Sequence, residues 1–174
     1  RALLTPPPPP RWAAQVKTTA LGAGEELLRR LMEKFADNKI VIRQANLRLL
    51  KKLMGVVSPT RVLRPLLSYV SHANSHIREQ AIAVLIQSLN AASSLTRDMY
   101  RAALDALAVA LTDSKPRVRS AALEAAAVRA VSSGPVAFSR LLDESSLDAA
   151  TRAEIDERVR MGVLPQVADD GIVV

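Results

Sequence analysis

The sequence predicts an all-α fold in which pairs of helices repeat along the chain. Two features of the composition favour helices. The hydrophobic residues make up 49% of the 174 residues, but only five residues are aromatic. Most of the others are Ala, Leu and Val, which suit closely packed helix pairs. Glycine, which weakens helices, occurs only six times. The third feature is a polar turn followed by a basic helix start, which occurs three times.

The three copies centre on an arginine that directly follows a branched aliphatic residue. These arginines are Arg43, Arg78 and Arg119, and they lie 35 and 41 residues apart. Six residues before each arginine stands Asp37, His72 or Asp113. A period of about 35–45 residues with two helices per unit is typical of a HEAT-type α-solenoid. One helix pair cannot bury its own apolar face, so we expect the pairs to stack in series.

The N-terminal part differs in composition from the remainder. Five consecutive prolines, Pro6 to Pro10, predict an extended polyproline linker over residues 1–11. We expect residues 12–174 to form a partial HEAT-repeat domain that begins with a single helix from Trp12 to Ala23. Trp12 is expected to pack at the end of that helix, and the alternative is a contact with a partner.

Apolar periodicity and capping residues place the other helices. We expect helices over residues 25–36, 40–54, 60–71, 76–89, 97–111, 116–131, 136–142 and 148–161. The predicted start and stop residues are Gly55, Ser58, Thr96, Ser146 and Gly162. Pro116 fits the first turn of its helix, whereas Pro65 lies inside one and should bend it. The apolar surface of the helix over 40–54 is predicted to contain Ile42, Leu47, Leu49, Leu50 and Leu53.

Several classes of function are disfavoured. The chain has no cysteine, which excludes disulfides and thiolate metal sites. His72 and His76 lack the acidic partner of a metal-binding pattern, and no glycine-rich phosphate loop or nucleophile motif is present. We therefore predict no enzyme, no metal and no cofactor. No apolar run approaches the roughly 20 residues that span a bilayer, so no membrane association is expected.

The net charge of +7 predicts an acidic partner. Nucleic acid is a poor candidate, because aromatic residues for base stacking do not alternate with the basic ones. In a solenoid the turns within the repeats emerge along one edge. The candidate binding residues on these turns are Asn38, Lys39, Asn74, His76, Lys115 and Arg117. We expect the repeated Asp and Arg residues to join adjacent repeats. Lys39, Lys115 and Arg117 have no such role, which leaves partner binding or a solvated turn.

Residues 25–174 resemble a known family. The stretch Val118 to Ala125, introduced by Asp113-Ser114-Lys115, resembles the fifth repeat of TOG domains, most of all in the crescerin (TOG array regulator of axonemal microtubules) family. The stretch His72 to Ala81 resembles the preceding turn and helix of that family. Arg158-Val159-Arg160, with the tail Leu164 to Val167 and Gly171, resembles the end of the domain.

The resemblance implies a non-catalytic module that binds tubulin or microtubules through its intra-repeat turns. The six candidate residues would then face tubulin. It also implies a cytoplasmic, cytoskeletal protein of the cilium or axoneme. The alternative is a HEAT-repeat scaffold that binds other proteins of a larger axonemal assembly through its helix faces.

Overall fold

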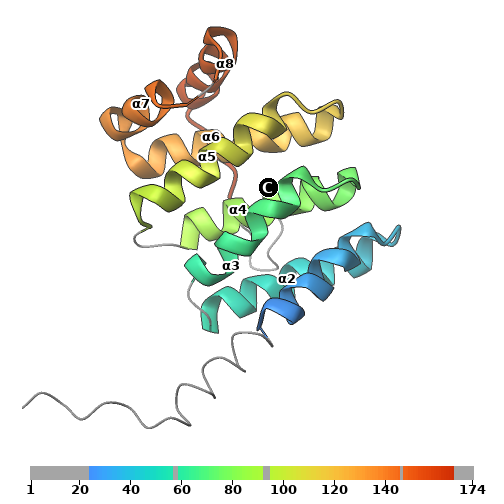
Figure 1. The fold of residues 1–174 in the computed structure, drawn as a ribbon. Helices are drawn as coiled ribbons and strands as arrows, with labels where there is room; N and C mark the ends of the chain where they lie inside the picture. The colour runs from blue at the N-terminus through green and yellow to red at the C-terminus, as the bar shows by residue number, and fades with distance from the viewer. Residues whose placement is uncertain (1–23, 57–58, 92–94, 146, 167–174) are drawn as a thin grey trace, which may run out of the picture.

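The computed structural model describes residues 24–56, 59–91, 95–145 and 147–166. Every regular element in these ranges is a helix (Figure 1). After a helix over residues 24–33, the elements are η1 (Lys34–Ala36), α2 (Ile40–Val56), α3 (Pro59–Leu66), η2 (Leu67–Ser71), α4 (Ser75–Ala91), α5 (Arg97–Leu111), α6 (Pro116–Ser133), α7 (Pro135–Asp143) and α8 (Ala149–Arg160). The predicted proline-rich linker and the predicted helix from Trp12 to Ala23 lie outside the described residues.

The helices form two layers. The second helices of successive pairs contact one another in series, α2 with α4, α4 with α6 and α6 with α8. The first helices lie on the other side of this row, where α5 contacts η2 (Figure 1). Each pair thus covers the apolar face of its neighbour, as expected for a solenoid. Arg158 of α8 also binds Glu124 of α6, with Nε 2.7 Å from Oε1, which ties the last helix to the stack.

The core lies between these layers and contains many small side chains. Helix α6 packs against both α4 and α5. Its Ala122, Ala125 and Ala126 are completely buried. Short side chains let helix axes approach closely, so the alanine content noted in the sequence supports the stacking of the layers. Asn46 adds a polar link, because its amide nitrogen donates to the carbonyl of Leu31 at 2.7 Å.

Most predicted helix ends are confirmed. Thr96 caps α5, and its hydroxyl accepts the N–H of Met99. Gly162 follows α8 with a φ of 74°, a conformation that glycine adopts without steric cost. Pro65 lies inside α3, and the helix changes to the tighter 3-10 form at Leu67.

Two predicted boundaries and one predicted core position were wrong. Gly55 does not end its helix, because α2 continues to Val56. Asp148, rather than Ser146, caps α8: its Oδ1 accepts the N–H of Thr151 at 2.7 Å. Leu49 is 52% exposed. The buried face of α2 follows Leu47, Leu50 and Met54, and Leu49 lies off this face because helical residues two positions apart point in different directions.

Candidate binding edge formed by the intra-repeat turns

Three turns, over residues 37–39, 72–74 and 112–115, lie along one edge of the solenoid (right-hand side of Figure 1). We call these turns, with the first residues of the helices that follow them, the turn edge. The arrangement follows from the stacking, because each turn joins the two helices of one pair.

An arginine six residues after the Asp or His of each turn holds the turn to the following helix. The Nη1 donors of Arg43, Arg78 and Arg119 lie 2.7, 2.8 and 2.6 Å from the carbonyl oxygens of Asp37, His72 and Asp113. Charge-assisted bonds of this kind are stronger than neutral ones. The spacing of six residues between the Asp or His and the arginine therefore lets the arginine side chain extend from the first turns of the helix back to the preceding turn.

The same Asp or His of each turn also accepts the backbone N–H two residues later. Asp37 Oδ1, His72 Nδ1 and Asp113 Oδ1 accept from Lys39, Asn74 and Lys115 at 2.8, 3.0 and 2.8 Å. His72 can take the place of aspartate in this turn because an unprotonated ring nitrogen is also an acceptor. Histidine does not, however, supply the negative charge that an aspartate has at this position.

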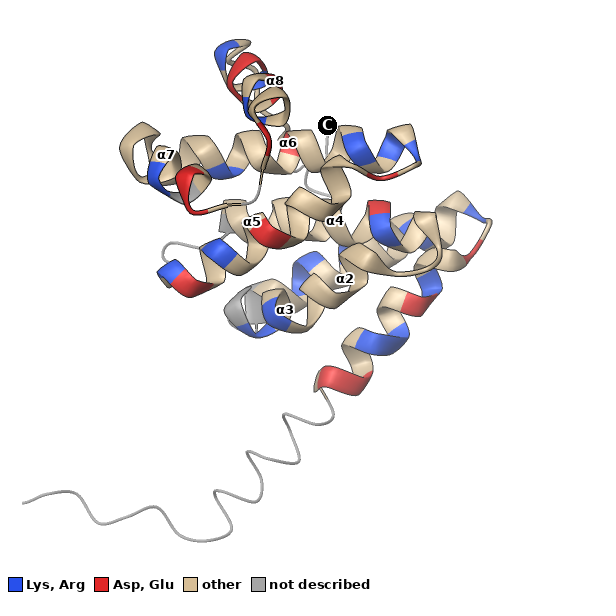
Figure 2. Cartoon of the chain, turned by 45° about the horizontal axis from the view of Figure 1, so that its top comes forward, with Lys and Arg blue, Asp and Glu red and all other residues tan. Residues whose placement is uncertain are grey.

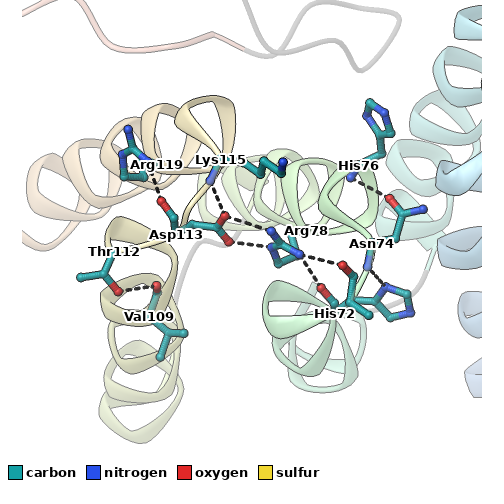
Figure 3. A network of polar contacts seen from close by, with 10 residues as sticks. His72, Asn74, His76, Arg78, Val109, Thr112, Asp113, Lys115 and Arg119 are labelled. Atoms are coloured by element: carbon teal, nitrogen blue, oxygen red, sulfur yellow. Dashed lines mark hydrogen bonds and ion pairs between the residues drawn. The ribbon is translucent and has the colours of Figure 1, made fainter.

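The negative charge of Asp113 joins two repeats. Arg78 donates Nε to Asp113 Oδ2 at 2.6 Å and Nη2 to Oδ1 at 2.9 Å (Figure 3). The two side chains are only 14% and 10% exposed. The bond from Arg78 lowers the pKa of Asp113, and the backbone N–H of Lys115 adds to this effect. The predicted Asp–Arg contact between adjacent repeats is confirmed at this position.

The equivalent contact one repeat earlier is missing in the described residues. Arg43 corresponds to Arg78, and His72 corresponds to Asp113. Because histidine stands in the aspartate position, Arg43 has no carboxylate partner among the described residues. The ring of His72 instead stacks on Tyr69, with 6.2 Å between centroids.

The six predicted site residues all lie on the turn edge. Asn38, Lys39, His76, Lys115 and Arg117 are exposed. Asn74 is half-buried, and its Oδ1 accepts the N–H of His76 at 2.9 Å, so part of its role is to shape the turn. In Figure 3 the side chain of His76 points away from the Arg78–Asp113 pair, and no dashed line joins the side-chain nitrogen of Lys115 to that pair.

The unpaired positive charges of the turn edge are its main chemical feature. Within the described residues, the side chains of Lys39, Lys115 and Arg117 make no hydrogen bond or ion pair. In Figure 2 basic residues lie at the start of α6 next to the acidic residue of its turn. Such an edge can attract an acidic surface and orient it, with a strength that falls as salt is added.

Sequence reasoning missed two apolar residues on this edge. Ile40 and Val41 directly follow Lys39 and are 59% and 71% exposed. They lie in the first turn of α2, where the arriving turn leaves little for a side chain to pack against. The available signal covered only Val41, which lies off the buried stripe of Leu47 and Leu50; Ile40 lies seven residues before Leu47 and therefore on the same face of α2. They give the turn edge an apolar surface beside a positive charge.

Two other kinds of site are missing from the part of the chain that the structure describes. No group of three or more His, Asp or Glu residues in the described ranges is placed to hold a metal ion. In the same ranges, no helix has both the length and the hydropathy that a membrane crossing requires.

Comparison with known proteins shows what the chain is similar to. No family model matches it. The TOG array regulator of axonemal microtubules protein 1 of mouse is 44% identical over 86 residues, and the human protein is 43% identical over 86 residues. The matched region is 49% of this chain but only 5% of either relative.

Solved structures extend the similarity to most of the chain. A chain from a study of crescerin, which uses a TOG domain array to regulate microtubules in the primary cilium, matches with a TM-score of 0.70 and 32% identity. The match covers 87% of this chain and 66% of that one. A chain from a study of microtubule plus-end tracking by XMAP215, CLIP-170 and EB1 has a TM-score of 0.71 over 83% of this chain and 59% of that one, at 18% identity, which shows the shared fold.

These matches confirm the predicted α-solenoid class, and they assign the chain to a non-catalytic type of module. We conclude that this chain contains a TOG domain related to those of crescerin, the TOG array regulator of axonemal microtubules.

Proposed function

We propose that the turn edge binds tubulin, either as free dimers or within the microtubule, in a ciliary or axonemal protein. The mouse and human relatives are named as regulators of axonemal microtubules, and crescerin regulates microtubules in the primary cilium. The whole protein's partners and location are part of this proposal, because the chain aligns with a small part of those relatives.

One observation on this chain carries the proposal. The repeated arginines of the turn edge bind turn carbonyls, and Arg78 also binds Asp113. In contrast, Lys39, Lys115 and Arg117 are exposed and leave their charges available. The domain thus separates charges that hold its turns from charges that it presents to a partner.

The proposed contact combines charge with apolar area. Lys39 would meet acidic groups of the partner, while Ile40 and Val41 would lose solvent-exposed apolar surface on binding. Charges at the rim of an interface mainly accelerate encounter and set orientation. We therefore expect salt to weaken the interaction without abolishing it.

The test uses two binding assays at two salt concentrations. One is co-sedimentation with stabilised microtubules, and the other is gel filtration with free tubulin. The triple variant Lys39→Ala, Lys115→Ala, Arg117→Ala should bind about tenfold more weakly or worse, since rim charges contribute up to about 1 kcal/mol each. Its melting temperature should stay near that of the parent.

A matched control keeps the change in net charge the same. Arg61, Arg64 and Arg101 are exposed and lie on α3 and α5, outside the turn edge. Their triple alanine variant should bind like the parent. Equal weakening of both variants would mean that only net charge matters. Unchanged binding of the turn-edge variant, with binding lost on changes to the helix faces, would favour the scaffold alternative.

A further inference from the structure

A cleft lies at the edge opposite the turn edge. Its lining residues come from the N-terminal parts of α5 and α7 and the C-terminal end of α6, and these parts of the helices lie on the left-hand side of Figure 1. Its volume is about 480 Å³. The lining includes three arginines, Arg97, Arg129 and Arg140, one from each of the three helices.

Arg129 is the unusual member of this group. It is 2% exposed, yet no carboxylate in the described residues pairs with it. Its guanidinium carbon lies 3.4 Å from the ring centroid of Tyr100, and Nη1 lies 3.5 Å from Ser132 Oγ. Its Nε is buried without a hydrogen-bond partner. Buried charges are normally paired, because removing them from water is costly.

Burial lowers the pKa of Arg129, and the nearby Tyr100 opposes this change. An arginine pKa is so high that the side chain stays protonated at any physiological pH. The floor of the cleft therefore carries a permanent positive charge in an environment with little water, where electrostatic attraction is strongest.

Two further positive groups lie at the rim. Arg97 already binds Glu144, while Arg140 has no ion-pair partner among the described residues. Helix α7 begins at Pro135 after Gly134 and has no side-chain cap, so the N–H of Ala137 beside the cleft is left without an intrahelical acceptor. The positive end of this helix dipole adds to the attraction for an anion.

We propose that this cleft binds a phosphoryl group. After the Arg97–Glu144 pair is counted as neutral, Arg129 and Arg140 leave two positive charges, which match a phosphate dianion. Phosphate also offers at least three oxygen acceptors, and donors approach it from α5, α6 and α7. A carboxylate has only two oxygens and one charge, and would leave donors from one helix unused.

We assign the phosphoryl group to inorganic phosphate or a phosphorylated side chain, which share this chemistry. Preference for a phosphorylated lipid headgroup is the competing outcome of the test. The cleft lies far from the turn edge along the helices, so binding here is independent of the proposed tubulin contact. Failure of one proposal leaves the other intact.

The experiment measures binding to the purified domain by calorimetry at constant ionic strength. The probes are inorganic phosphate, the peptide Gly-phosphoserine-Gly, the peptide Gly-Asp-Gly and a soluble glycerophosphoinositol phosphate. We expect the phosphorylated probes to bind and Gly-Asp-Gly to bind at least about tenfold more weakly. The phosphorylated probe with the highest affinity identifies the source of the group.

Arg140→Ala should reduce phosphate binding by about tenfold, because it removes an exposed rim donor without disturbing the core. Arg129→Lys keeps the charge and tests the floor, and its folding is checked by circular dichroism. Arg101→Ala on α5 is the matched control and should bind like the parent. The proposal is overturned if no phosphorylated probe binds, if Gly-Asp-Gly binds equally well, or if Arg140→Ala binds as tightly as Arg101→Ala.

Discussion

The ion pair between Arg78 and Asp113 should be a main link between two repeats. The substitution Asp113→Asn tests it with little change of shape, because the amide oxygen can still accept the N–H of Lys115. The substitution removes the negative charge of the carboxylate, which accepts two hydrogen bonds from Arg78 at 2.6 and 2.9 Å. Arg78 would remain half-buried beside a neutral amide.

The magnitude follows from the exposure of the pair. Hydrogen bonds between charged groups contribute about 1.5–3 kcal/mol, and breaking a fully buried pair costs about 3–5 kcal/mol. At 14% and 10% exposure the side chains are partly screened by water. We expect Asp113→Asn to lower the free energy of unfolding by about 2 kcal/mol, which shifts the melting temperature by roughly 4–8 °C in a domain of this size.

The assay is a double-mutant cycle with Arg78→Met, measured by urea unfolding. The bonds from Arg78 to His72 and Ala73 are lost both in Arg78→Met and in the double variant, so their contribution cancels in the cycle. A coupling free energy of about 1.5–2.5 kcal/mol is expected at pH 7. A value below about 0.5 kcal/mol, typical of exposed pairs, would refute this account of the link.

The same pair predicts a dependence on pH. Arg78 lowers the pKa of Asp113 in the folded state, so the folded protein holds this proton less tightly than the unfolded chain does. The stabilisation is therefore complete above the unfolded pKa of about 3.9 and is lost as pH falls through the folded pKa. The parent should lose more stability than Asp113→Asn on acidification below about pH 4. Parallel stability curves for the two proteins would contradict the assignment.

Two further predictions concern single positions. His72→Asp should raise the free energy of unfolding by about 0.5–1 kcal/mol in thermal unfolding at pH 7, because it gives Arg43 a carboxylate partner like the one that Arg78 has. If stability does not rise, or if the gain persists when Arg43 is replaced by Met, then His72 and Arg43 do not correspond to Asp113 and Arg78. Gly134→Ala should cost about 1–2 kcal/mol in urea unfolding, because Gly134 separates α6 from α7 with a φ of 77° that an L side chain tolerates poorly. No atom lies within 4 Å of the added Cβ, so backbone strain alone is tested, and a neutral Gly134→Ala would show that the break between the helices relaxes.

Local chemistry was readable from the sequence. The helices of the described residues lie where periodicity placed them, and the spacing of six between Asp37 and Arg43 marks a turn that its own arginine closes. Thr96 and Gly162 mark helix ends for local reasons as well. These features depend on residues within two helical turns of each other, and such short distances are encoded directly in the order of residues.

Contacts between distant residues were decided by the tertiary structure. Whether Arg78 meets Asp113, 35 residues later, depends on how two repeats stack. The packing of the helices also leaves Ile40 and Val41 exposed on the turn edge. The candidate residues of that edge could thus be named from the sequence, but their separation into bonded and available charges could not.

Arg129 is the clearest example of a residue whose surroundings the sequence alone does not reveal. In the sequence it is one arginine in a helix rich in alanine, with no partner nearby. Only the packing of α5, α6 and α7 buries it against Tyr100 and places Arg97 and Arg140 around it. The sequence by itself determined the repeated helix pairs and their turns, because these follow from local periodicity and capping. The tertiary structure decided which charges are neutralised, because burial and pairing depend on neighbours that only folding brings together.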